Sequence, residues 1–163
     1  MDIEIEILSP VSSAFKDTIP HARVGWSTTS GEVEAPVGYD WHGFSFRDFD
    51  GSVFHQARRH SYGSPFGVGD VIGILIKLPP IQQDSPLLPV TTLPIPGSTA
   101  SGRAKHIEPM IVHQGSEIEF FVNGKSQGIA FRDIPRGTYY PAASSYMGAT
   151  LRFRFGSHCK FPV

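Results

Sequence analysis

Apolar and polar residues alternate over several short stretches of this chain, and a period of two is the pattern of a β-strand that buries one face. At the N-terminus three isoleucines alternate with Asp2, Glu4 and Glu6, so this acidic row is expected to face water. The same alternation marks residues 44–48 and 151–155. Each of these stretches is therefore predicted to be a half-buried strand.

Glycine-containing turns connect the predicted strands and indicate two hairpins. Asp50-Gly51 precedes a returning strand, and Asn123-Gly124 separates strand 118–122 from strand 127–131. Asp-Gly and Asn-Gly favour the tight turns that match the twist of antiparallel strands. Apolar and aromatic runs predict further strands at 22–26, 70–78 and 139–142. No helix longer than a turn or two is predicted, so we expect an all-β fold, an antiparallel two-sheet β-sandwich.

One segment breaks the strand pattern. Residues 79–102 hold six prolines together with Ser and Thr and almost no charge. A segment of this composition buries too little apolar surface to offset the entropy lost on ordering. We therefore predict a single domain over residues 1–163, with a flexible proline-rich insertion at about 79–105.

Composition narrows the class of protein. The chain is 40% hydrophobic and 18% charged and holds 17 Gly, as expected of one turn-rich globular domain. Its net charge of −1 lacks the excess of Lys and Arg that nucleic acid or an anionic membrane surface requires. Cys159 is the single cysteine, the N-terminus lacks the basic and apolar regions of a signal peptide, and no apolar run is long enough to span a bilayer. An intracellular domain is therefore expected.

The residue types used in catalysis and metal binding are present, but not in the required arrangements. The seven histidines follow no metal-ligand spacing. Residues 67–73 depart from a dinucleotide fingerprint, because an apolar strand follows where a helix must begin. There is no nucleophile elbow, and Cys159 lacks a partner motif. We therefore predict no enzyme activity, metal, cofactor or small-molecule substrate.

Arginines provide the candidate recognition groups. Arg58-Arg59-His60 is the one tight basic cluster and is expected to be a solvated loop or a weak contact for an acidic partner. Arg23 and Arg47 instead lie in predicted strands beside aromatic residues. Their guanidinium groups either reach water or a neighbouring carboxylate, or form a fork for a partner's carboxylate. Composition alone favours the first interpretation, because most surface arginines are solvated.

Several motifs give the chain a resemblance to a known family. Arg-Val-Gly-Trp-Ser at 23–27, Ala-Pro-Val-Gly-Tyr-Asp at 35–40, Val-Phe-His-Gln at 53–56, Gly-Asp-Val-Ile-Gly at 69–73, Phe-Phe-Val-Asn-Gly-Lys-Ser-Gln-Gly at 120–128 and Tyr-Tyr-Pro-Ala at 139–142 resemble a SPRY domain. The Tyr-Asp and Phe-His-Gln elements and the closing run 155–162 are similar, more narrowly, to one branch of that family. This branch is the trithorax-group absent-small-or-homeotic-discs-2 subunit of COMPASS and MLL histone methyltransferase complexes. The resemblance covers nearly the whole chain outside the insertion.

The resemblance implies a SPRY (B30.2-like) sandwich that is nuclear and not catalytic. It implies binding to an acidic and apolar segment of the WD40 β-propeller subunit, and the pair would stimulate the SET-domain methyltransferase that modifies histone H3. The family's pocket residues correspond to Arg23, Pro36, Tyr39 and Arg47. Pro36 and Tyr39 would form an apolar floor, and the arginines would hold carboxylates at its rim. A position expected to be basic in animal members is Phe49 here, so apolar contact would replace part of the charge.

Two departures from the family are expected. The chain begins within what should be an early strand, so the first strands of the family are predicted to be missing or supplied by another chain. It ends at Val163, before the family's segment that binds a small dimeric subunit, so that partner is not predicted. The alternatives are a SPRY module that recruits substrates to a ubiquitin ligase and a carbohydrate-binding sandwich. The first would bring a RING, SOCS-box or LisH-type region and the second a secretion signal or calcium motif, and the sequence shows none of these.

Overall fold

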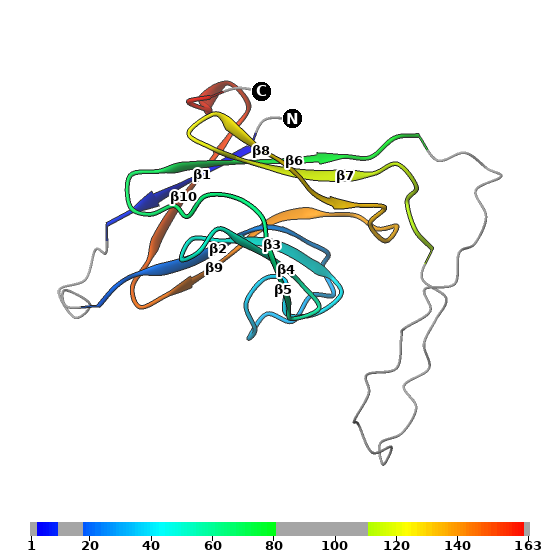
Figure 1. Ribbon diagram of the computed structural model, residues 1–163, viewed down its shortest axis with the longest axis horizontal. Coiled ribbons are helices and arrows are strands. Elements are labelled where there is room, and N and C mark those ends of the chain that lie inside the picture. The colour runs from blue at the N-terminus through cyan, green and yellow to red at the C-terminus, as the bar shows by residue number, and fades with distance from the viewer. Residues whose placement is uncertain (1–2, 10–17, 81–110, 162–163) are drawn as a thin grey trace, which may run out of the picture.

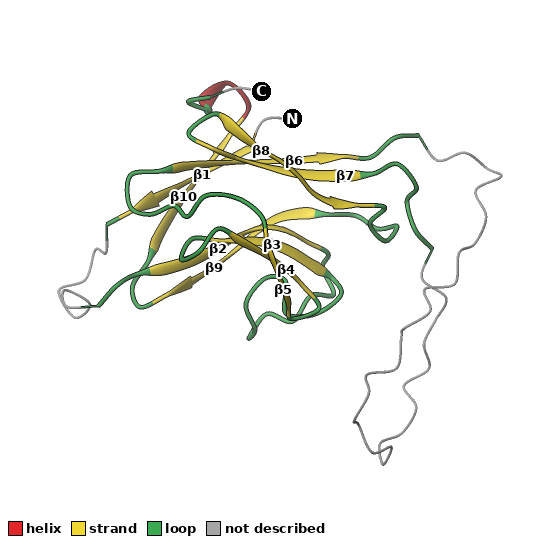
Figure 2. Ribbon diagram, viewed as in Figure 1, coloured by secondary structure: helices red, strands yellow, loops and turns green. Residues whose placement is uncertain are grey.

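Two antiparallel sheets face each other across one hydrophobic core in the computed structural model (Figures 1 and 2), which describes residues 3–9, 18–80 and 111–161. Sheet I has the strand order β10-β1-β6-β7-β8, and sheet II has the order β5-β4-β3-β2-β9. In chain order the strands are β1 (Ile3–Leu8), β2 (His21–Ser27), β3 (Gly43–Arg47), β4 (Ser52–His55), β5 (Arg58–Ser61), β6 (Val71–Lys77), β7 (Glu117–Val122), β8 (Lys125–Arg132), β9 (Tyr140–Tyr146) and β10 (Thr150–Phe155). A short 3₁₀ helix, η2 (Gly156–His158), follows β10. The predicted all-β two-sheet sandwich is confirmed.

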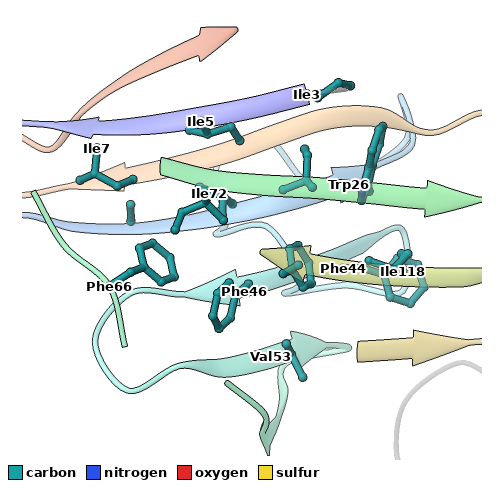
Figure 3. Close-up of a cluster of buried hydrophobic side chains, with 14 of the residues drawn as sticks. Ile3, Ile5, Ile7, Trp26, Phe44, Phe46, Val53, Phe66, Ile72 and Ile118 are labelled. Carbon is teal, nitrogen blue, oxygen red and sulfur yellow. The ribbon is translucent and has the colours of Figure 1, made fainter. Parts of the chain in front are cut away.

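The core lies where the inner faces of the two sheets meet. Figure 3 shows Ile5 of β1 and Ile72 of β6 on one side and Phe44 and Phe46 of β3 on the other. The Phe46 ring packs on the rings of Phe66 and Phe120, with centroids 4.8 and 5.3 Å apart. Core residues occupy alternate strand positions, which is why a period of two in the sequence predicted most of the strands correctly.

The predicted hairpins are confirmed, and one strand was missed. β3 and β4 pair across the turn at Asp50-Gly51, and β7 and β8 pair across the turn at Asn123-Gly124. The basic cluster at 58–60 was expected to be a loop but forms β5, an exposed edge strand paired with β4. In the turn between β4 and β5, Gln56 and Ala57 both have positive φ, at positions where Asn or Gly is usual. The proline-rich insertion predicted at 79–105 lies outside the described residues from 81 onward.

The acidic row of β1 does not face water, contrary to the expectation from its alternation. Glu4 is 2% exposed and Glu6 is 8% exposed, because the segment after β10 returns across the outer face of sheet I. The Glu4 carboxylate accepts the backbone N–H groups of Lys160 and Phe161, each at 2.6 Å. Glu6 accepts from Arg154 Nη2 and Lys160 Nζ, also at 2.6 Å each. The two carboxylates therefore fasten the C-terminal segment to the sheet.

Acid should weaken the fold through Glu6. Its hydrogen bonds with Lys160 and then with Arg154 lower the pKa of Glu6 from 4.5 to about 2. A carboxyl group with a lower pKa in the folded state contributes stability that is present above its unfolded pKa and lost as the pH falls toward the folded value. We expect the free energy of unfolding of wild type, measured by urea titration, to fall more steeply between pH 5 and pH 2 than that of Glu6→Gln.

The matched control is Glu34→Gln, since Glu34 is an exposed residue on a loop of sheet II. This variant should keep the pH dependence of wild type. Parallel stability curves for wild type and Glu6→Gln would contradict the role of Glu6.

Candidate functional site

Two arginines stand side by side on the outer face of sheet II. Arg23 of β2 and Arg47 of β3 are direct partners across the antiparallel strand pair. The central guanidinium carbon of Arg23 lies 3.9 Å from the ring centroid of Phe54, and that of Arg47 lies 4.7 Å from it. Phe54 is therefore a shared aromatic base for both cations. As predicted from the alternation, Arg47 points away from the core ring of Phe46.

Arg47 is held in place by a carboxylate of its own hairpin. Its Nε donates to Asp50 Oδ1 at 3.0 Å and its Nη2 to Asp50 Oδ2 at 2.5 Å, which is a bidentate pair. Arg59 of β5 lies 3.5 Å from the same Oδ2 atom. The bond from Arg47 holds the pKa of Asp50 well below its usual range. Arg47 is thus pre-oriented, and only its remaining N–H groups are free for a ligand.

Arg23 differs from Arg47 in its surroundings. It is half-buried, and no Asp or Glu of the described ranges forms an ion pair with it. Burial lowers the pKa of Arg23, although the group stays charged near neutral pH. A half-buried cation without an ion-pair partner has lost water contacts that an anion can replace. Arg23 is therefore a candidate anion-binding group of this face.

The Pro36–Tyr39 element is a tight turn. The N–H of Tyr39 donates to the carbonyl oxygen of Pro36 at 2.9 Å, and Gly38 at the third position has a φ of +85°. This is the conformation of a type II turn, in which the third residue is normally glycine. The side chain of Tyr39 is exposed. The turn thus presents Tyr39 to solvent at the edge of the outer face.

Hydrogen bonds fasten this turn to sheet II. Ser45 Oγ of β3 donates to the carbonyl oxygen of Val37 at 2.6 Å. The N–H of Val37 donates to Ser144 Oγ of β9 at 2.7 Å, and the N–H of Ala57 donates to the carbonyl oxygen of Gly38 at 3.0 Å. The turn therefore touches strand β3, strand β9 and the β4–β5 hairpin, and its position depends on all three.

The four predicted site residues share one face but do not line one pocket. Arg23 and Arg47 line a cleft of about 360 Å³ at the ends of β2, β3 and β9. Pro36 lines a second cleft of about 360 Å³ beneath its own loop, and Tyr39 lines neither of the two. The clefts are neighbours, because Ser144 of the second cleft is the strand partner of Arg23. The four residues thus belong to two neighbouring clefts and an exposed turn, and not to the single pocket that was predicted.

Sequence reasoning missed two residues that organise this face. Phe54 supports both guanidinium groups, and Asp50 fixes Arg47. The signal for Phe54 was its alternation with Val53, which places its ring on the opposite side from the core.

The described residues contain no group of three or more His, Cys, Asp or Glu side chains that could hold a metal ion. Nor is any helix in that part of the chain long and apolar enough to cross a membrane.

Substituting Gly38 should loosen the site without removing any of its functional side chains. A Cβ at this position would lie 2.6 Å from the carbonyl oxygen of Phe54 and 2.6 Å from Ser45 Oγ, on a backbone with positive φ. We expect Gly38→Ala to lower the free energy of unfolding by about 1–3 kcal/mol. We also expect faster proteolysis within the 28–42 loop.

The control for this substitution is Gly67→Ala, because no atom lies within 4 Å of the Cβ that it would add. Gly67→Ala should match wild type in urea unfolding and in protease resistance. If Gly38→Ala resisted protease as well as Gly67→Ala, the turn would not depend on the contact with β4.

Known proteins share both the sequence and the fold of this chain. A model of the SPRY domain matches residues 11–79 and 102–158. The Set1/Ash2 histone methyltransferase complex subunit ASH2 of Drosophila melanogaster is 36% identical over 149 residues, which cover 86% of this chain and 27% of that protein. The corresponding subunit ash-2 of Caenorhabditis elegans is 33% identical, with 83% of this chain and 27% of that protein covered. The chain thus spans about a quarter of the length of these relatives.

A solved structure gives independent support for the fold. A crystal structure of a human SPRY domain superposes with a TM-score of 0.58 at 20% identity, covering 93% of this chain and 74% of that chain. At this identity the likeness concerns the fold alone. It agrees with the two-sheet sandwich and with a sequence match that spans most of the chain. The resemblance expected from the sequence is confirmed, and the chain belongs to the SPRY domain family.

Proposed function

We propose that this chain is a non-catalytic interaction module of a nuclear histone H3 lysine methyltransferase complex of the COMPASS or MLL type. In this role it binds an acidic and apolar segment of the WD40 β-propeller subunit and so stimulates the SET-domain methyltransferase. Its similarity to the fly and worm Set1/Ash2 complex subunits supports the class of complex. The chemistry of the outer face of sheet II supports the class of ligand.

The single observation that supports an acidic ligand is the environment of the Arg23 side chain. Its guanidinium group is half-buried and stacked on Phe54, and no carboxylate in the described part of the chain forms an ion pair with it. Binding a partner's carboxylate would restore the electrostatic interactions that burial removed. Arg47 stands beside it with two of its N–H groups already engaged by Asp50. The pair therefore suits an acidic ligand that approaches along β2 and β3.

Apolar contacts would complete the recognition. Tyr39 presents an exposed ring on its turn, and Pro36 lines the cleft that neighbours the one lined by the arginines. An aromatic ring offers large contact area with little loss of side-chain freedom. An extended segment that crosses the face would place its carboxylates at the arginines and its apolar residues toward the Pro36–Tyr39 turn.

The test is calorimetric binding of the acidic WD40-subunit segment to this domain, together with methyltransferase assays on the reconstituted complex. The control ligand has its Asp and Glu residues changed to Asn and Gln. We expect saturable binding of the acidic segment only, and a faster reaction when the domain is included. Equal binding of the neutral control, or no binding of either segment, would overturn the proposal.

A further inference from the structure

A further cleft, of about 270 Å³, lies at the opposite end of sheet II from the paired arginines. It is formed by the loop that joins β2 to β3 and by the loop that joins β8 to β9. Ser27, the last residue of β2, is four positions from Arg23, which corresponds to about 13 Å along the strand. Its walls include Thr28, Trp41, His42, Arg136, Thr138 and Tyr139. We call it the Trp41 cleft.

Arg136 gives the Trp41 cleft a cation without an ion-pair partner. Its Nε atom is buried and has no hydrogen-bond acceptor, and no Asp or Glu of the described residues forms an ion pair with it. None of the described residues that line the cleft is acidic. A buried donor without an acceptor is rare, because it has lost its hydration without a replacement. An anion toward which the guanidinium group turned would supply the missing acceptor.

The backbone around Arg136 is fixed by the fold. The N–H of Arg136 donates to the carbonyl oxygen of Ile111 at 2.7 Å. The preceding residue, Pro135, pairs with Val112 in an isolated bridge. The hydroxyl group of Tyr139 donates to the carbonyl oxygen of Pro135 at 2.7 Å and closes the loop on itself. Only the side chain of Arg136 therefore has to move when a ligand binds.

Trp41 supplies a second wall, a large ring that is 44% exposed. The indole lies against the ring of His42, with centroids 3.8 Å apart and planes at 33°. His42 is itself anchored, because its Nδ1 lies 2.9 Å from Thr28 Oγ1 and its backbone N–H donates to Asp40 Oδ1 at 2.9 Å. The exposed part of the indole is therefore held in place as a flat apolar surface on which another ring can stack.

We propose that the Trp41 cleft binds a carboxylate that a partner protein carries beside an aromatic ring. Arg136 binds the carboxylate through its forked N–H groups, and Trp41 stacks on the ring. A single cation favours a carboxylate over a phosphate group, because phosphate groups on proteins are usually recognised by clusters of arginines. The cleft is smaller than most small-molecule sites, which favours one group of a larger partner over a free ligand. This inference does not depend on the proposed function.

Three small probes test the inference in NMR titrations of the isotope-labelled domain. N-acetylphenylalanine carries both groups, N-acetylphenylalaninamide lacks the carboxylate, and N-acetylalanine lacks the ring. The chain has two tryptophans, so the indole N–H signal of Trp41 reports binding and that of the buried Trp26 serves as an internal reference. We expect N-acetylphenylalanine to shift the Trp41 signal and the Nε–H signal of Arg136, and to bind about tenfold more tightly than either control probe.

Variants assign the two contacts. Arg136→Gln removes the charge and should abolish the preference for N-acetylphenylalanine over its amide. Trp41→Ala should abolish the preference for N-acetylphenylalanine over N-acetylalanine, read from the Arg136 signal. Two matched controls should keep both preferences. Lys125→Gln removes an exposed cation of the β7–β8 hairpin, and Phe155→Ala removes a ring of sheet I that is 49% exposed.

The outcomes separate this inference from the proposed function. Arg23→Ala should leave the shift of the Trp41 signal unchanged. Equal affinities of wild type for the acid and the amide, or no shift of the Trp41 signal at millimolar probe, would overturn the inference and leave the arginine pair untouched. Tighter binding of phenyl phosphate than of N-acetylphenylalanine would overturn the carboxylate assignment. A wild-type dimer that Trp41→Ala dissociates would assign the cleft to a second copy of the chain instead.

Discussion

Replacing Arg23 by Ala is expected to weaken binding of the acidic WD40-subunit segment by about 2–5 kcal/mol. The partner's carboxylate would then face a half-buried site without its cation, and the ring of Phe54 would lose a charged group stacked at 3.9 Å. Stability should change little, because none of the described acidic residues pairs with Arg23. Calorimetry on the folded variant measures the loss of affinity, and urea unfolding measures the stability.

Two further arginine variants make this result specific. Arg47→Ala should weaken binding as well, but it should also lower the free energy of unfolding, because it leaves the carboxylate of Asp50 without its bidentate partner. Arg58→Ala removes an exposed cation on the edge strand β5 and should change mainly the salt dependence of binding. Unchanged affinity in Arg23→Ala would contradict the assignment of this face.

Local pattern was sufficient to predict most of the fold. The strands around Val24, Phe46 and Phe120 were predicted because each alternates or carries a buried apolar run. The β7–β8 hairpin was predicted because Asn123-Gly124 favours one class of turn. These features depend on residues that are close in the sequence, and the structure confirms them.

The errors concern contacts between distant segments. Alternation assigned Glu4 and Glu6 to one face of β1 correctly, but it carries no information on what covers that face. The cover is the segment around Lys160, which lies far away in the sequence. Strand β5 was missed because Gln56 and Ala57 form its turn, where sequence rules expect Asn or Gly.

In the candidate site, too, the residues could be predicted from the sequence but their contacts with distant segments could not. Family resemblance selected Arg23, Pro36, Tyr39 and Arg47, and the structure places all four at the outer face of sheet II. The resemblance did not indicate that Arg47 is already paired with Asp50, nor that Pro36 and the arginines line different clefts. Both facts follow from strand register and loop packing, which one sequence does not specify.

Gly25→Ala is expected to have the largest effect on stability, with a loss of about 3 kcal/mol or more in the free energy of unfolding. A Cβ at Gly25 would lie 2.0 Å from the carbonyl oxygen of Phe44 and 2.9 Å from the Cα atom of Ser45. Both atoms belong to the backbone of the neighbouring strand β3, so no side-chain rotation can relieve the contact. A domain of this size has a total stability of only about 5–15 kcal/mol, and the loss should be plain in urea unfolding.

The matched control is Gly73→Ala in the central strand β6 of sheet I. The Cβ added there would meet the side chain of Phe121 at 3.2 Å, and the backbone around it leaves more room. We expect Gly73→Ala to change stability by less than about 1 kcal/mol. Equal urea midpoints for the two variants would mean that β2 and β3 can move apart at Gly25 without a loss of stability. Because the pairing of these strands sets Arg23 opposite Arg47, Gly25→Ala should also lose binding of the acidic segment, whereas Gly73→Ala should keep it.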